Sequence, residues 1–148
     1  MYFNISNIAI FFIFALRNKN HADMIEDLKP GMKNTARKTV TDQNTAAAAG
    51  TGAMGVFSTP SMIAMMEEAS FLLLKNQGLA SVGTGVNIKH LRACLPGTEV
   101  WAEAEIESID RRAVYFKVTA YDSKGEIGKG THSRFIIDPE KFMKKLEG

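Results

Sequence analysis

The sequence predicts an α+β fold in which an antiparallel β-sheet wraps around one long central α-helix. The helix is predicted at residues 60–76, where apolar side chains occur on nearly every side of a segment that contains no internal glycine. Four later segments alternate apolar and polar residues, which is typical of strands with one buried face. A helix with apolar side chains on every side must be buried by surrounding structure, and the apolar face of a sheet can bury it.

The length of 148 residues suits a single domain. Residues 8–16 form an apolar run that is shorter than the roughly 20 residues of a membrane-spanning helix. The run also lacks the preceding basic residue and the following cleavage site of a secretory signal. We therefore expect residues 1–23 to be an N-terminal extension outside the native fold, with Met24 as the native start and residues 24–148 as one domain. A short membrane-associating or dimer-packing segment is the alternative.

Charge and cysteine content exclude several classes of protein. The net charge of +2 comes from 18 basic and 16 acidic residues, which spread along the chain without the basic stripe of a nucleic-acid-binding surface. Cys94 is the only cysteine, so the chain has no intrachain disulfide and no thiolate-rich zinc site. The three histidines are too scattered for a metal site. We expect a cytoplasmic protein that binds no metal, nucleic acid or membrane.

The central helix has clear signals at both ends. Residues 33–41 form the first predicted strand, and the small residues 42–55 that follow fit either a short helix or a loop. Thr59 is the predicted N-cap, because its hydroxyl directly precedes Pro60, whose fixed φ suits the first helical position. Gly78 marks the end.

The remaining sheet is predicted as a meander of four strands. These strands span residues 81–91, 99–108, 113–121 and 126–137. The short connections at residues 110–112 and 122–125 are typical of hairpins. Each of the two middle strands is predicted to have one apolar face that is buried away from water, here called its dry face. In residues 99–108 this face consists of Val100, Ala102, Ala104 and Ile106, and in residues 113–121 it consists of Val114, Phe116, Val118 and Ala120. In the strand before them, one face should carry Val82, Thr84, Val86, Ile88 and His90.

Glu67 is the strongest candidate for chemistry. At helical spacing it shares an apolar stripe with Ile63 and Phe71, whereas Glu68 lies on a more polar side and should be solvated. A carboxylate on the apolar stripe of a buried helix is costly unless it is paired. Glu67 is therefore either a paired structural carboxylate or a functional one, and we favour the functional role.

Thr59 and His90 are further candidates because of their positions in the predicted elements. Thr59 lies at the helix N-terminus, where free N–H groups and the helix dipole can polarise a carbonyl, although an N-cap threonine needs no catalytic role. His90 ends a strand and could form an acid–base pair with a buried carboxylate; a surface or packing role is the alternative. His21 and His132 are its competitors, the first in the N-terminal extension and the second as a plain sheet residue.

Residues 57–69 (FSTPSMIAMMEEA) and 81–91 (SVGTGVNIKHL) resemble the hotdog-fold thioesterases related to fluoroacetyl-CoA thioesterase. The resemblance extends over residues 28–137. It implies a hotdog fold and an acyl-CoA thioesterase that releases a carboxylic acid and free CoA, with no cofactor apart from the CoA of the substrate. The threonine, glutamate and histidine of the family match Thr59, Glu67 and His90, which are therefore the expected catalytic residues.

The resemblance also implies a homodimer whose sheets join edge to edge, with active sites at the interface, so that His90 can serve the helix of the partner chain. A tetramer is the alternative to the dimer. Gly83, Thr84 and Gly85 are expected to bind the substrate. Fluoroacetyl-selective members carry phenylalanines shortly before the threonine, and residues 46–55 contain none, so this selectivity is not implied. A non-enzymatic acyl-CoA-binding module and a hotdog hydratase or dehydratase are the alternatives.

Overall fold

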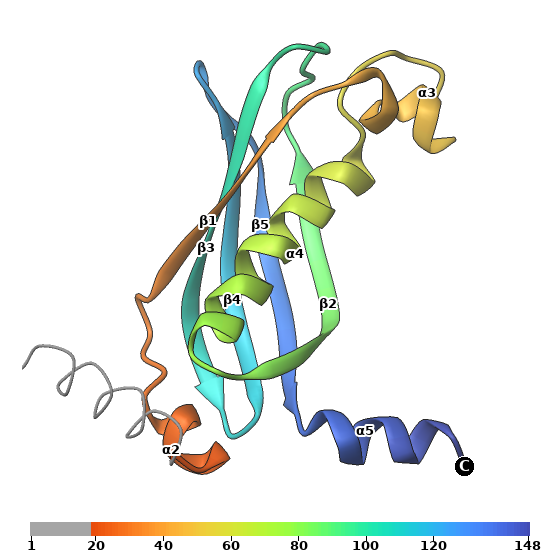
Figure 1. Cartoon of the computed structure of the whole chain (residues 1–148). Coiled ribbons are helices and arrows are strands. Elements are labelled where there is room, and N and C mark those ends of the chain that lie inside the picture. The colour runs from red at the N-terminus through yellow and green to blue at the C-terminus, as the bar shows by residue number, and fades with distance from the viewer. Residues whose placement is uncertain (1–18) are drawn as a thin grey trace, which may run out of the picture.

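The computed structural model describes residues 19–148 and has one curved sheet around one long helix (Figure 1). The strand order is β1-β3-β4-β5-β2, and every neighbouring pair is antiparallel. The strands are β1 (Lys33–Thr39), β2 (Ala80–His90), β3 (Glu99–Asp110), β4 (Ala113–Asp122) and β5 (Gly125–Ile137). The helices are α2 (His21–Glu26), the 3-10 helix η1 (Asp42–Asn44), α3 (Ala46–Ala49), α4 (Thr59–Asn76) and α5 (Pro139–Leu146). The predicted α+β architecture is confirmed.

Helix α4 begins one residue earlier than predicted. Its N-cap is Ser58, whose Oγ accepts a hydrogen bond from the Ser61 N–H at 3.1 Å. The prediction of Thr59 as the N-cap is therefore wrong, because the neighbouring hydroxyl already satisfies the free backbone donor. Thr59 is the first helical residue, and its side chain can bond elsewhere. At the other end Gly78 has φ +81, the left-handed conformation expected just beyond a helix.

The core lies between α4 and the concave face of the sheet. The helix contributes the buried residues Met62, Met65, Met66, Ala69, Ser70, Leu73 and Leu74. Both predicted dry faces of β3 and β4 are confirmed, since all eight side chains are at most 1% exposed. The expectation of burial on every side of the helix is wrong for a single chain, because the sheet covers only one side. Ala64 and Phe71 are exposed, although the ring of Phe71 lies at the edge of the sheet beside Arg134 of β5.

The segment between β1 and α4 contains both a helix and a loop. After η1 and α3 the chain turns at Gly50 (φ +70) and returns to α4. Phe57 is 1% exposed, its N–H donates to the carbonyl of Cys94 at 2.8 Å, and it forms an isolated β-bridge with Thr45. These contacts place α3 beyond the N-terminus of α4, at the upper right of Figure 1.

A β-bulge interrupts the alternation of β2. Gly83 is opposite Arg134 and Gly85 is opposite Ser133, so Thr84 is the extra residue. The predicted common face for Val82, Thr84 and the later residues of β2 is wrong for this reason, because a bulge reverses the alternation that follows it. Gly83 faces the helix, whereas the Thr84 hydroxyl lies 2.8 Å from that of Ser133 on the other face.

Two helices lie outside the predicted elements. Helix α2 packs Met24 and Ile25 against the core, and α5 follows β5 with Asp138 as its N-cap. Residues 1–18 of the predicted extension are outside the described residues, and the boundary at Met24 stays a prediction. No helix within residues 19–148 has the length and hydropathy needed to cross a membrane.

Candidate active site

Thr59 and His90 come together at one end of the sheet. Thr59 Oγ1 lies 2.9 Å from His90 Nδ1, which joins the first residue of α4 to the last residue of β2. Burial lowers the pKa of His90 below its usual value, so the neutral imidazole is favoured. Within residues 19–148, His90 Nε2 is the buried side-chain nitrogen that lacks a hydrogen-bond partner. It therefore has unused capacity for a proton or a hydrogen bond.

A cavity of about 410 Å³ lies beside this pair. Its lining comes from the α3 segment, the start of α4 and the chain after β2: Ala46, Thr51, Val56, Phe57, Thr59, His90, Leu91, Arg92 and Ala93. This volume is within the range of sites that hold small organic ligands. Phe57, which is deeply buried, is the only phenylalanine in the lining.

Glu67 lies farther along α4 and does not contact His90 within the same chain. It follows Thr59 by eight residues, which is about 12 Å along a helix. The Glu67 side chain is 43% exposed, whereas that of Glu68 is 38% exposed and lies 2.8 Å from Lys38. The predicted contrast between a buried Glu67 and a solvated Glu68 is wrong for one chain, because Glu67 lies on a flank of the helix that the sheet covers only in part.

The charged partner of Glu67 is Arg134, whose Nη1 lies 3.6 Å from Glu67 Oε2. Arg134 is only 6% exposed, and it donates from Nε to Ser81 Oγ at 2.8 Å and from Nη2 to the Ser81 carbonyl at 3.2 Å. Its guanidinium also lies 5.7 Å from the ring centre of Phe71. Burial lowers the pKa of Arg134, and the charge of Glu67 opposes this effect. The cation is thus fixed in place with its charge toward Glu67.

His132 completes this second group. It is 3% exposed, and its Nδ1 lies 2.8 Å from the Gly85 carbonyl. A carbonyl only accepts, so Nδ1 carries the proton and Nε2 accepts from Arg134 Nη1 at 3.4 Å. Burial lowers the pKa of His132, which favours this neutral form. The bulge that turns Gly85 toward His132 therefore also fixes the tautomer that faces Arg134.

Gly83 leaves the space in which the Glu67 carboxylate lies. A Cβ at Gly83 would be 3.1 Å from Glu67 Oε2 and 3.5 Å from His132 Cε1. Of the three residues expected to bind substrate, Gly83 borders Glu67, Gly85 bonds His132, and Thr84 faces the outer side of the sheet. Substrate binding by these residues stays a prediction.

Arg134 and His132 are candidate site residues that the sequence motifs do not single out. The sequence feature that could have identified them is the alternation of residues 128–136. This alternation places both side chains on the same face of the strand as Ile136, toward the core. Within residues 19–148, no three His, Cys, Asp or Glu side chains are grouped in a way that could hold a metal ion. The two groups offer a hydroxyl–imidazole pair and a carboxylate beside a fixed cation, which are the parts of general acid–base chemistry.

A five-stranded antiparallel sheet around one long helix is the hotdog fold, and the solved structures that share it at 27–31% identity are thioesterases, which are thioester hydrolases. The fluoroacetyl-CoA-specific thioesterase family matches residues 40–140, and the chain belongs to this family. The fluoroacetyl-CoA thioesterase of Streptantibioticus cattleyicolor is 37% identical over 94 residues, which are 62% of this chain and 68% of that protein.

Solved structures agree with this assignment. A crystal structure of a point mutant of the fluoroacetyl-CoA-specific thioesterase superposes with a TM-score of 0.75 at 31% identity, covering 81% of this chain and 96% of that one. A thioesterase superfamily member from Thermus thermophilus superposes with a TM-score of 0.72 at 27% identity, covering 80% of this chain and 93% of its own. The predicted hotdog fold and thioester hydrolase activity are confirmed.

Proposed function

We propose that this chain hydrolyses acyl-CoA thioesters to a carboxylic acid and free CoA, at a site that two copies of the chain build together. The proposal of a shared site rests on one observation. Within one chain, the Thr59–His90 pair is separated from Glu67. Glu67 pairs with Arg134, and no hydrogen bond or ion pair joins it to His90. A second copy can supply the missing partner for each group.

The free edge of β2 supports an edge-to-edge homodimer. The sheet ends in β1 on one side and β2 on the other. Strand β1 carries Lys33, Arg37 and Lys38, and such charges discourage pairing at an edge. Strand β2 has no charged residue before Lys89, and its outer backbone groups have no strand partner within the described chain. An antiparallel β2–β2 pair related by a two-fold axis would join two copies, and a tetramer remains the alternative.

This pairing would complete the site. In a register centred between Val86 and Asn87, Gly83 of one strand lies opposite His90 of the partner subunit. Because Gly83 borders Glu67 within its own chain, the register brings that carboxylate toward the partner's Thr59 and the partner's His90. The two-fold axis produces two such sites for each dimer.

The proposed chemistry assigns one role to each group. Glu67 acts as the general base that removes a proton from water, and the resulting hydroxide attacks the thioester carbonyl carbon; direct attack by the carboxylate is the alternative. Thr59 and the N-terminus of α4 orient the carbonyl and stabilise the oxyanion. When the C–S bond breaks, the proton that Glu67 took from water passes to His90, which delivers a proton to the leaving sulfur, so that Glu67 and His90 return to their starting forms. Arg134 positions the Glu67 carboxylate.

The acyl groups that the chain accepts depend on the cavity beside Thr59. Relatives are named for fluoroacetyl-CoA, and a threonine-to-serine variant of that thioesterase was solved in complex with acetyl-CoA. Residues 46–55 contain no phenylalanine, so we propose hydrolysis of acyl-CoAs without selection for the fluorinated acyl group. A cytoplasmic location suits the single cysteine, because burial raises the pKa of the Cys94 thiol and keeps it unreactive.

Release of free thiol from a panel of acyl-CoAs tests the proposal. Hydrolysis releases thiol, a hydratase or dehydratase changes the absorbance without thiol release, and a binding module does neither. Glu67→Gln should lower kcat by about 10²–10⁴-fold, the usual contribution of a general base. Glu68→Gln is the matched control, since this neighbouring carboxylate pairs with Lys38, and it should stay near wild type. Equal effects of the two changes would remove Glu67 from the mechanism.

A further inference from the structure

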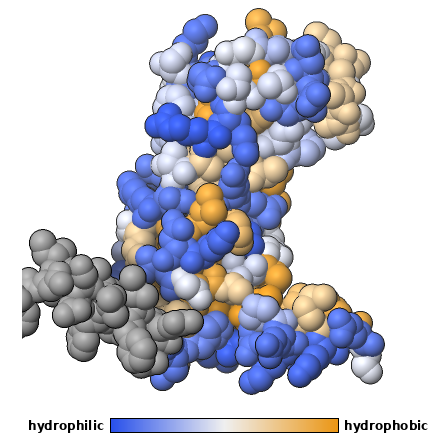
Figure 2. Space-filling model, in the orientation of Figure 1, coloured by the Kyte–Doolittle hydropathy of each residue, from blue (hydrophilic) through white to orange (hydrophobic). Residues whose placement is uncertain are grey.

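Two projections flank the free edge of β2. Figure 1 shows α3 and α5 extending to the same side of the sheet as β2, one near each end of that strand. The space-filling view has a hollow on this side between the two projections (Figure 2). A second sheet that pairs with β2 would enter this hollow and meet both projections.

The α5 projection packs little within its own chain, where Phe142 is its only half-buried side chain. None of its eight residues is buried, and Met143 and Leu146 are 50% and 67% exposed. Phe135 at its base is 42% exposed. Isolated helices shorter than about 12 residues are marginal in water, so most of their stability comes from packing an apolar face. Met143 and Leu146 are the apolar residues of α5 that the described chain leaves uncovered.

The α3 projection consists of residues 43–57 and the loop at residues 91–95, and Arg92, which pairs with Asp122, is its only charged residue. Met54, Leu91 and Leu95 are 67%, 50% and 68% exposed and lie in the loops around α3 and after β2. Residues 43–66, which include α3, contain no charged side chain. Exposed surfaces normally carry charge, and apolar patches without it mark places where another surface binds.

We propose that α5 of each chain packs against the α3 projection of the partner chain, which rests on the β2-paired homodimer of the proposed function. Ala80 pairs with Ile137, so α5 begins beside the Ala80 end of β2. In an antiparallel β2–β2 pair this end lies next to the His90 end of the partner strand, which leads into Leu91 and Leu95. The two-fold axis thus brings the apolar face of α5 to the exposed apolar residues of the partner's α3 projection, twice in each dimer.

The contact between α5 and the α3 projection of the partner chain lies beside the active-site cavity. Ala46, Thr51 and Val56 of the α3 projection line the cavity beside Thr59 and His90. Helix α5 of one chain therefore forms the outer support of the cavity in the other, and it holds the segment that contacts the acyl group. The segment is otherwise fixed to the fold mainly through Thr45 and Phe57 at its two ends.

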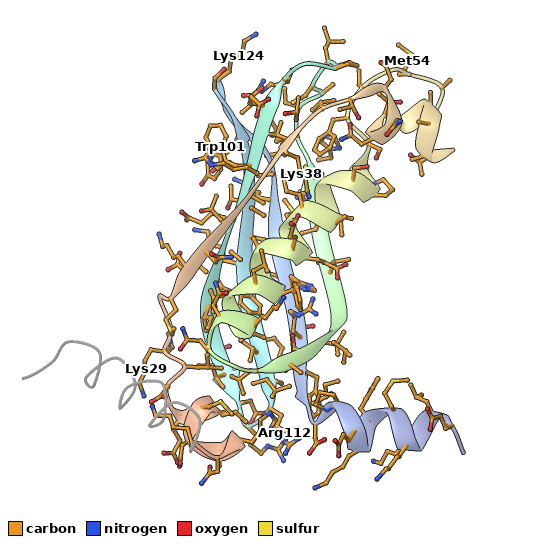
Figure 3. The ribbon with its side chains drawn as sticks, in the orientation of Figure 1. Lys29, Lys38, Met54, Trp101, Arg112 and Lys124 are labelled. Atoms are coloured by element: carbon orange, nitrogen blue, oxygen red, sulfur yellow. The ribbon has the colours of Figure 1, made fainter. Side chains whose placement is uncertain are left out.

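Cysteine cross-linking tests the contact directly, because the single native cysteine is buried. In a chain carrying Met54→Cys and Met143→Cys, a short bis-maleimide should join two chains in most of the dimers. Lys124→Cys with Met143→Cys is the matched control: Lys124 lies at the same end of the sheet but away from Met54, at the β4–β5 turn (Figure 3). This control should form few cross-links.

The outcomes separate the two proposals. A dimer on size-exclusion chromatography that cross-links no better than the control overturns the α5 contact and leaves the dimer intact. A monomer overturns both. A second variant, Met143→Asp with Leu146→Asp, should raise KM several-fold more than it lowers kcat while the circular dichroism spectrum stays unchanged. Unchanged KM in this variant contradicts the support of the cavity by α5.

Discussion

The guanidinium of Arg134 lies 3.6 Å from the carboxylate of Glu67, and it links the last strand of the sheet to the exposed side of the central helix. Arg134 is itself held by Ser81 and backed by His132. A buried cation with this many fixed partners has little freedom, so it can set the direction of the carboxylate.

Arg134→Ala should lower kcat by at least tenfold, because Glu67 loses the cation that orients it. The lost hydrogen bonds to Ser81 should cost about 1–3 kcal/mol of unfolding free energy. Added guanidine should restore part of the turnover, since it can occupy the vacated space. Arg134→Lys should recover less than full activity, because a lysine does not reproduce the planar array of donors. Wild-type turnover in Arg134→Ala would exclude the positioning role.

Gly83→Ala should reduce activity more than stability. The new Cβ would lie 3.1 Å from Glu67 Oε2, so the carboxylate must shift by a few tenths of an ångström. Gly85→Ala is the matched control, because its Cβ would meet only the Ser133 hydroxyl at 3.2 Å. We expect a larger fall in kcat for Gly83→Ala at similar melting temperatures. The opposite order would separate Gly83 from the site.

Thr59→Val should lower kcat with little change in the fold, because valine keeps the shape of threonine and removes the hydroxyl that bonds His90. Loss of one group that stabilises an oxyanion typically costs about 10²–10³-fold in kcat. Thr59→Ser keeps the hydroxyl and should retain most activity. The ratio of the two kcat values measures the contribution of the hydroxyl, and a ratio near one would assign Thr59 a structural role only.

The histidines should make stability depend on pH. Burial lowers the pKa of His90 and of His132 below the usual value of 6.5 in the folded state. The unfolded chain therefore binds protons first as the pH falls, so this contribution to stability is present above pH 6.5 and is lost below it. Urea unfolding should show a falling midpoint from pH 7 to pH 5. His132→Gln should flatten the curve, and an unchanged slope would contradict the linkage.

Much of the fold could be predicted from the sequence because its signals are local. Alternation identified the dry faces of β3 and β4, and Pro60 and Gly78 bounded α4 to within one residue. The N-cap was misplaced because Ser58 and Thr59 both offer a hydroxyl before the proline. Helix α5 carries the same kind of signal, an Asp138 cap before a proline, and was predictable.

The site was less predictable because its contacts depend on register and on a partner. Glu67 and Arg134 are far apart in sequence, and their approach depends on how α4 packs across β5, which local periodicity does not specify. The exposure of the Glu67 stripe follows from how much of the helix one sheet can cover. Helical periodicity marks an apolar stripe, but it does not tell whether the same chain or a second copy buries it.

A mixed dimer of two inactive variants tests most directly whether two chains share the site. Chains with Glu67→Gln and chains with His90→Ala can be co-expressed with different affinity tags, and the mixed dimer can be purified. Such a dimer would have one site with both changes and one site with Glu67 and His90 both intact. The account predicts about half of the wild-type thiol release for each dimer, from its one intact site of two. A mixed dimer as inactive as its two parents would place Glu67 and His90 of one chain in the same site and contradict the shared site.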